Sequence, residues 1–256
     1  GSVIMNYKSV ESLVLDTKKI ILDKTTLSVS IKAKNDFVTD IDIAISDFLK
    51  TKLKEIDPTV GFFSEEEEGN LQDNCWILDP IDGTTNLIYG YNLSSVSLGH
   101  YLDGEVVYGI VYNPFTEEIF TAERGKGAFL NHKKRLKVST RNIDESLIEF
   151  GAGSTHKEFT EENFNLVKKI FEQCVDVRRI CSSALDLCYI ASGRIDGYFE
   201  RILKPWDIAA GSLILEEAGG IITDYFGNPI QFAKQSSVIA SNGVIQNFLI
   251  GTINQN

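Results

Sequence analysis

The stretch Trp76–Asn86, which reads WILDPIDGTTN, is the most informative part of the chain. Its apolar start predicts a short buried strand, Trp76–Leu78, that delivers Asp79 to the strand end. Pro80 lacks the N–H group needed to extend a sheet, so we expect the chain to turn there. Asp82 follows three residues after Asp79, and both carboxylates can face one point. The stretch therefore predicts an acidic site at the end of a buried strand.

The residues that follow favour phosphate binding beside these acids. Gly83 allows a backbone conformation that other residues resist. Thr84 and Thr85 would present free backbone N–H groups if a helix starts there, and the amino end of a helix binds anions well. Carboxylates for a cation and amides for an anion thus lie side by side in one segment.

Two carboxylates this close repel each other, so either one is protonated or a cation lies between them. Mg²⁺ prefers oxygen ligands, and pairs of divalent ions lie about 3.5–4 Å apart in phosphatase sites. Two ions need more than two carboxylates. The sequence offers Glu65, Asp42 and Asp207, each at the edge of an apolar stretch.

Each of these acids also has a simpler interpretation. Asp82-Gly83 could be an ordinary turn, and the acidic run 65–68 is typical of a solvated face. Asp207 could cap the helix that follows it, and Asp42 could be an exposed helical residue. Sequence spacing alone leaves these alternatives open.

The composition is typical of a globular protein of 256 residues, with one large domain or two closely joined ones. Apolar residues make up 43% and charged residues 24%, so a substantial core is expected. The net charge of -11 argues against nucleic acid as a partner. No apolar run reaches the roughly 18 residues of a membrane span, and no signal peptide is visible. We therefore expect a cytoplasmic protein without membrane contacts, in which Gly1 and Ser2 are typical of residues left by a cloning vector.

The four cysteines and three histidines are scattered and form no zinc-binding pattern. We expect the cysteines to be reduced. The chain also lacks the GxSxG, GxGxxG and HExxH motifs. These absences leave the carboxylates as the main candidates for chemistry.

The remaining pattern predicts two halves that form one compact unit. In residues 3–144, helical spacing over about 6–24 and 38–56 precedes short strands, and Asp103-Gly104 marks a hairpin in an antiparallel block. In residues 145–256, strands and helices alternate, as in a layered α/β structure. The first half is expected to be α+β and to carry the acidic stretch, and the second half to complete the site.

Together these segments resemble the inositol monophosphatase family, part of the lithium-sensitive, metal-dependent phosphatase superfamily that includes fructose-1,6-bisphosphatase. The first family signature matches Trp76–Asn86, and the second matches Trp206–Gly220. Glu65-Glu66 lies at the expected distance before the first signature. Residues 36–42 are similar to the family's Asp-aliphatic-Val-Thr-x-x-Asp, and 183–200 to its later substrate-side segment.

The resemblance implies two or three bound Mg²⁺ ions. Glu65, Asp79 and the Ile81 carbonyl would hold the first ion. Asp79, Asp82 and Asp207 would hold the second. Glu65 would also contact a third, weaker ion.

The same resemblance implies the remaining roles in the site. Thr84, with Asp42 behind it, would orient and help to deprotonate the attacking water. The backbone amides of Gly83 and Thr84 would hold the phosphate. The alcohol half of the substrate would face four residues, Asp82, Ala184, Glu200 and Asp207.

The fold implied by the resemblance is an α/β (α+β) structure, the five-layered αβαβα sandwich of this family. A homodimer is expected by the same analogy. Family members often have Gly where this chain has Ser182, so a side chain there could narrow the alcohol pocket.

The predicted function is Mg²⁺-dependent hydrolysis of a small phosphate monoester by activated water. An inositol monophosphate or a related sugar or polyol phosphate is the expected substrate. Fructose 1,6-bisphosphate, nucleotide 2′- or 3′-phosphates and NADP are alternatives for the same site.

Two other functional classes remain as alternatives. The first is a phosphatase of the haloacid dehalogenase type, which uses an Asp-x-Asp nucleophile. Asp40-Ile41-Asp42 has that spacing, but it is expected in a helix and not at a strand end. The second is a non-catalytic protein that binds a sugar phosphate.

Overall fold

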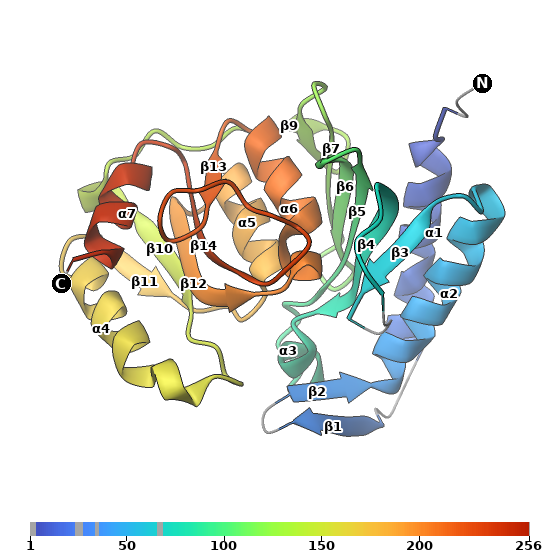
Figure 1. Cartoon of the computed structure of the whole chain (residues 1–256), viewed down its shortest axis with the longest axis horizontal. Helices are drawn as coiled ribbons and strands as arrows, with labels where there is room; N and C mark the ends of the chain where they lie inside the picture. The colour runs from blue at the N-terminus through green and yellow to red at the C-terminus, as the bar shows by residue number, and fades with distance from the viewer. Residues whose placement is uncertain (1–3, 24–27, 34–35, 66–68, 256) are drawn as a thin grey trace.

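Five layers of secondary structure follow one another across the molecule (Figure 1). The computed structural model describes residues 4–23, 28–33, 36–65 and 69–255. Across these residues a helix pair, a seven-stranded sheet, a second helix pair, a five-stranded sheet and a third helix pair succeed one another. This confirms the αβαβα sandwich that the sequence predicts.

The larger sheet has the strand order β3-β4-β5-β6-β7-β8-β9. Only β3 and β4 pair in parallel, and the other neighbours are antiparallel. The strands are β3 (Gly61–Ser64), β4 (Asn74–Asp82), β5 (Ser95–Leu102), β6 (Glu105–Asn113), β7 (Glu118–Glu123), β8 (Ala128–Leu130) and β9 (Lys134–Arg135). The hairpin expected at Asp103-Gly104 joins β5 and β6, and both turn residues have positive φ, as a tight two-residue turn requires.

The smaller sheet has the order β11-β10-β12-β14-β13. Its members are β10 (Leu147–Gly151), β11 (Asp176–Arg178), β12 (Gly197–Leu203), β13 (Ile221–Thr223) and β14 (Ser236–Ser241). β10 is parallel to both of its neighbours, whereas β14 is antiparallel to β12 and β13. The alternation of strands and helices expected in this part of the sequence is therefore confirmed.

The outer helices each bury one face. α1 (Tyr7–Leu22) and α2 (Asp40–Ile56) pack on the larger sheet, and α4 (Thr160–Phe171) and α7 (Gln246–Ile253) pack on the smaller one. Their polar faces remain at the surface, as the helical spacing of apolar residues requires. Within the residues described, no helix combines the length and the apolar character needed to cross a membrane.

The central helices are buried between the two sheets. α5 (Ser183–Ala191) and α6 (Pro205–Glu217) are apolar over most of their surface because a sheet covers them on either side. The approach is close: a Cβ atom on Gly109 of β6 would lie only 2.9 Å from the Ala210 carbonyl oxygen of α6. The first turns of both helices reach the end of β4, where the acidic stretch lies (Figure 1).

The course of β4 corrects one expectation. Pro80 does not turn the chain out of the sheet, because β4 continues to Asp82, which pairs with Ser95 of β5. The register between β4 and β5 shifts between Asp79 and Asp82. Such an irregularity interrupts the hydrogen-bond ladder, so a residue without an N–H group is tolerated there.

A small hairpin was not expected from the sequence. β1 (Val29–Ala33) and β2 (Asp36–Thr39) pair as a separate two-stranded sheet. Val38 belongs to β2 and not to the helix that the sequence predicted from this residue onward. α2 therefore begins at Asp40, with Thr39 as its cap. The hairpin lies beside the short helix α3 (Thr84–Ile88), near the end of β4 (Figure 1).

A buried histidine joins α1 to the larger sheet. The Tyr7 hydroxyl lies 2.7 Å from His100 Nδ1, and His100 Nε2 lies 2.7 Å from the Asn74 side-chain oxygen. A neutral imidazole satisfies both bonds, with Nε2 donating and Nδ1 accepting. Burial lowers the pKa of His100 to about 4.

We predict that His100 makes the protein less stable in mild acid. The pKa is about 4 in the folded protein and 6.5 in the unfolded chain, so the unfolded chain binds the extra proton between these values, and stability falls as the pH drops. Between pH 7 and 4.5 the loss from this residue should be about 2 kcal/mol. Urea unfolding at both pH values should show a smaller loss for His100→Asn than for the unmodified protein. His156→Gln, at a more exposed histidine, is the control, and equal losses in all three proteins would contradict the prediction.

Candidate functional site

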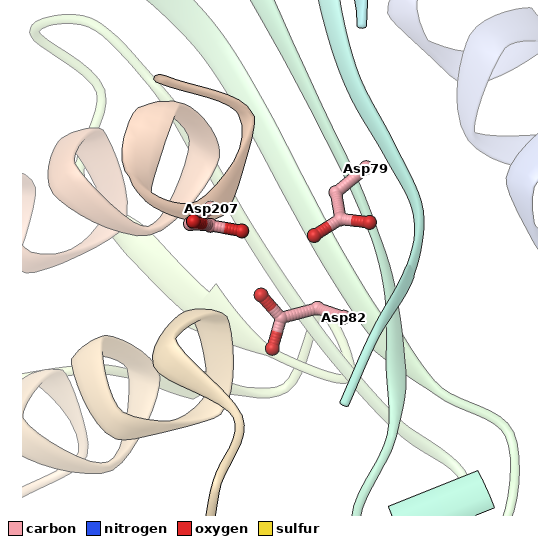
Figure 2. A group of neighbouring side chains, drawn as sticks. All are labelled: Asp79, Asp82 and Asp207. Atoms are coloured by element: carbon pink, nitrogen blue, oxygen red, sulfur yellow. The ribbon is translucent and has the colours of Figure 1, made fainter. Parts of the chain in front are cut away.

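Three aspartates converge at the end of β4. Oxygen atoms of Asp79, Asp82 and Asp207 all lie within 4.8 Å of one another. Figure 2 shows the three carboxylates pointing toward a common centre, two from the strand and one from the first turn of α6. Residues more than a hundred positions apart in the sequence therefore share one site.

The irregularity in β4 explains how its two aspartates meet. Side chains alternate between the faces of a regular strand, so residues three apart point in opposite directions. The register shift between Asp79 and Asp82 removes this conflict and turns both carboxylates to one side. The expectation that both could face one point thus depends on a local distortion that spacing alone does not reveal.

Asp207 caps α6 and also lies in the acidic cluster, so the two interpretations that the sequence left as alternatives are compatible. Its Oδ2 accepts a hydrogen bond of 2.8 Å from the Lys204 N–H group, which helps to cap α6. Pro205 occupies the first turn, where its missing N–H group costs nothing. The capping hydrogen bond therefore holds the Asp207 carboxylate so that it points toward Asp79 and Asp82.

The site is strongly unfavourable for negative charge. Asp79 and Asp82 are each 3% exposed, and Asp79 Oδ1 has no hydrogen-bond partner among the residues described. Burial, followed by the charges of Asp82 and Asp207, raises the pKa of Asp79 well above its ordinary value. Burial also raises the pKa of Asp207, and the charge of Asp82 is the second largest cause of this increase. An unpartnered buried oxygen within an all-carboxylate cluster fits a hard cation such as Mg²⁺.

Two serines hold Asp82 in place. The Ser182 hydroxyl donates to Oδ1 at 2.5 Å, and the Ser183 hydroxyl donates to Oδ2 at 3.1 Å. Burial raises the pKa of Asp82 to about 6, and these bonds, with one from the Ala184 N–H group, oppose the increase. The sequence analysis considered Ser182 only as a residue that could narrow the alcohol pocket, and it did not predict the contact of either serine with Asp82, because nothing in their spacing indicates a contact with a strand a hundred residues away.

Ser182 does not adopt the left-handed conformation that favours glycine. Cys181 has φ 60, in the left-handed region, whereas Ser182 is extended at φ -147 and precedes α5. Ser182 therefore needs no glycine-like backbone, and its side chain turns to Asp82. Ser182 also lines the cavity, and the narrowing of the alcohol pocket remains a prediction.

Thr84 and Asp42 form a hydrogen-bonded pair next to the aspartates. The Thr84 hydroxyl lies 3.1 Å from Asp42 Oδ1 and 3.3 Å from the Ile81 carbonyl oxygen. Asp42 is only 4% exposed, so the exposed alternative for this residue is wrong. Its other oxygen, Oδ2, accepts bonds from the Thr39 N–H group at 3.0 Å and the Thr39 hydroxyl at 2.5 Å.

The backbone after Asp82 opens toward the same cavity. Gly83 has φ 88, and α3 begins at the next residue. A cavity of about 260 Å³ is lined by Gly83, Thr84 and Thr85 together with the three aspartates. The amides at the start of α3 lack helical partners and are available to an anion.

Glu65 lies at the edge of this cavity. It follows β3, its side chain is 38% exposed, and its carboxylate lies 3.5 Å from the Lys32 ammonium group. It is near enough for its charge to contribute to the raised pKa values of Asp79 and Asp207. The structure thus places Glu65 beside the three-aspartate cluster but outside it, and Glu66–Glu68 lie outside the described residues.

Glu200 lines the opposite side of the cavity. Its Oε1 accepts a bond of 3.0 Å from the Tyr198 hydroxyl on the same strand, β12. Burial raises the pKa of Glu200 to about 7, while Tyr198 and the Arg179 charge oppose the increase. Ala184, the other residue expected on this side, is fully buried and reaches Asp82 through its N–H group.

A second cavity of about 460 Å³ adjoins the first. Arg179 lines both cavities, and the second also contains Lys157 and two tyrosines, Tyr89 and Tyr91. The neighbouring Arg178 points elsewhere and pairs with Asp176 at 2.6 Å. Positive charge and aromatic surface thus lie next to the acidic cavity.

Comparisons with known proteins agree with this architecture. The chain matches the description "Inositol monophosphatase family" over residues 1–256. It is 38% identical to an inositol-1-monophosphatase of Mesorhizobium japonicum, covering 89% of this chain and 86% of the relative. It is also 38% identical to the Nus factor SuhB of Escherichia coli, covering 82% and 80%. A solved IMPase/NADP phosphatase complexed with Mg²⁺ and phosphate has a TM-score of 0.90 at 25% identity, covering 98% of this chain and 95% of that one.

We predict that Asp79→Asn removes most of the increase in thermal stability that Mg²⁺ causes. The substitution removes one buried charge, so the metal-free protein should be at least as stable as the unmodified one at pH 8. Saturating Mg²⁺ should raise the Tm of the unmodified protein by roughly 5–10 °C, because the ion binds the folded state. Thermal unfolding with and without MgCl₂ or EDTA should show little of this increase in Asp79→Asn. Asp47→Asn, at an exposed position of α2, is the control, and equal Mg²⁺ effects in all proteins would exclude Asp79 as a ligand.

Proposed function

Because the chain belongs to the inositol monophosphatase family, we propose that it is a Mg²⁺-dependent phosphatase that hydrolyses a small phosphate monoester. One observation carries the proposal: three aspartates, two of them buried and the third partly buried, share a centre, and one of their oxygens has no partner among the described residues. Such a cluster is costly unless it binds cations. The solved relative that contains Mg²⁺ and phosphate supports the choice of ion.

The carboxylates would hold two or three ions. Asp79, Asp82 and Asp207 would bind directly, with Glu65 and the Ile81 carbonyl completing the set. Bound Mg²⁺ would neutralise these charges, lower the pKa of water and attract an anionic ester to a protein of net charge -11. Ser182 and Ser183 would keep Asp82 in the required orientation.

Thr84 and Asp42 would handle the proton of the attacking water. The Thr84 hydroxyl donates to Asp42 Oδ1, which leaves its lone pairs free to accept a proton from water in the cavity. Asp42 would accept the Thr84 proton in turn, and Thr39 holds its second oxygen still. Glu65, at the cavity edge, would help to position the water.

The remaining residues would bind the two halves of the ester. The amides of Gly83 and Thr84 would hold the phosphate. Glu200, with Asp82, Asp207 and the Ala184 N–H group, would face the alcohol. Carboxylates in this position suit hydroxyl-rich alcohols, so an inositol monophosphate or a related polyol phosphate is the first candidate substrate.

A second candidate substrate is a larger nucleotide such as NADP. The adjoining cavity supports it, because Arg179 and Lys157 could hold a second phosphate and Tyr89 and Tyr91 could stack on a ring. The solved relative named IMPase/NADP phosphatase also supports NADP as a candidate substrate. Fructose 1,6-bisphosphate would also use Arg179.

The relatives named Nus factor SuhB are relevant to the question of which macromolecules this protein binds. Their name does not describe phosphatase activity, so a macromolecular partner would add to the hydrolytic function. The net charge still argues against direct nucleic acid binding. A homodimer and a cytoplasmic location remain predictions.

We predict that Asp82→Asn and Asp207→Asn each lower phosphate release on the order of 10³-fold, since ion positioning contributes several kcal/mol to catalysis. Phosphate release should be measured with MgCl₂ and with EDTA on inositol 1-phosphate, fructose 1,6-bisphosphate, 3′-AMP and NADP. Asp47→Asn is again the matched control. Equal release in EDTA would exclude the Mg²⁺ requirement, and a phosphorylated carboxylate during turnover would exclude direct attack by water and favour a covalent mechanism.

Lithium should inhibit the hydrolysis, as the family resemblance implies. The same release assay at tens of millimolar LiCl should show a large loss of activity, with NaCl at equal concentration as control. Unchanged activity in LiCl would remove lithium sensitivity from the proposal without touching the Mg²⁺ requirement.

A further inference from the structure

The carboxylate of Glu200 lies directly against a glycine of the neighbouring strand. Gly151 of β10 pairs with Glu200 of β12 in the parallel register. A Cβ atom on Gly151 would lie 1.3 Å from Glu200 Oε1, 2.2 Å from its Cδ and 2.7 Å from its Cγ. No residue with a side chain at position 151 is compatible with this orientation of Glu200.

The backbone does not explain the glycine. Gly151 is not among the glycines with positive φ, so its conformation is open to other residues. It is the last residue of β10 and continues the parallel register with β12. What the structure does show is that the Glu200 carboxylate occupies the space in which a side chain at position 151 would lie.

Tyr198 also contacts the Glu200 carboxylate. It lies two residues before Glu200, on the same face of β12, and is 1% exposed. Its hydroxyl donates to Oε1 at 3.0 Å. Tyr198 pairs with Glu149 of β10, so the two strands fix the tyrosine, and the tyrosine fixes Glu200.

Helix α5 and the cavity both lie next to Glu200. α5 packs against β12, and its buried Asp186 is close enough for the Glu200 charge to raise its pKa. The cavity beside Asp82 and Asp207 is the open direction. A Glu200 carboxylate displaced from Gly151 would therefore enter the space that the alcohol half is proposed to use.

We propose that Gly151 and Tyr198 are positioning residues that keep the Glu200 carboxylate back against β10 and thereby set which alcohols the pocket accepts. The inference rests on the proposed function and extends it to two residues that do not touch the substrate. With Glu200 held back, a polyol phosphate fits and can donate a hydroxyl to the carboxylate. With Glu200 displaced, the same alcohol meets a misplaced charge, whereas an ester that lacks hydroxyl groups loses no hydrogen bond.

The test compares a polyol ester with an ester that has no hydroxyl groups. Inositol 1-phosphate and p-nitrophenyl phosphate are hydrolysed in MgCl₂ by the unmodified protein, Gly151→Ala and Tyr198→Phe. KM for inositol 1-phosphate should rise about 10-fold or more in Gly151→Ala and several-fold in Tyr198→Phe. Both should keep kcat and KM for p-nitrophenyl phosphate within about 3-fold. Gly251→Ala, where a Cβ meets nothing within 4 Å, is the matched control.

A double-mutant cycle separates positioning from general damage to the fold. Glu200→Ala removes the group through which both residues are proposed to act, so Gly151→Ala should have little further effect in that background. An undiminished effect of Gly151→Ala without Glu200, or an equal loss with both esters, would overturn the inference.

A crystal structure of Gly151→Ala supplies a readout that does not depend on activity. The Glu200 carboxylate should have left β10 and entered the cavity. An unchanged Glu200 would overturn the inference even if no ester is hydrolysed, whereas failure of the unmodified protein on every ester would overturn the proposed function alone.

Discussion

Repulsion among buried carboxylates is the constraint on which the site depends. Carboxylate oxygens of Asp79, Asp82 and Asp207 lie within 4.8 Å of one another, and burial adds to the cost of each charge. A fold accepts such a cluster only when other interactions hold it together. Here those interactions are the ladder around β4, the cap of α6 and the two serines before and in α5.

The central helix layer brings these interactions to one point. α5 and α6 are covered by both sheets, so their positions are set by the largest core cluster of the protein. Their first turns then deliver Ser183 and Asp207 to the end of β4. The geometry of the acidic cluster is therefore a consequence of how the two sheets pack on the helices between them.

The sequence predicted the parts of this arrangement that depend on local pattern. Apolar spacing and turn residues predicted most helices and strands, and the Asp103-Gly104 hairpin lies where expected. The family signatures singled out the aspartates that converge. The roles of these residues in catalysis remain predictions.

What the sequence did not predict depends on contacts between distant segments. The distortion of β4 at Pro80 arises from its pairing with β5, and no local rule for proline reveals it. The same holds for Ser182 and Gly151, because Ser182 contacts Asp82 of β4 and Gly151 lies against the Glu200 carboxylate of β12. The β1–β2 hairpin is the corresponding case in secondary structure.

The carboxylate of Asp42 illustrates how closely chemistry and architecture are joined. One of its oxygens meets the Thr84 hydroxyl, and the other accepts the bonds from Thr39 that start α2. A helix cap of this kind contributes about 1 kcal/mol. A substitution of Asp42 would therefore loosen the amino end of a long surface helix in addition to any effect on the proposed proton transfer.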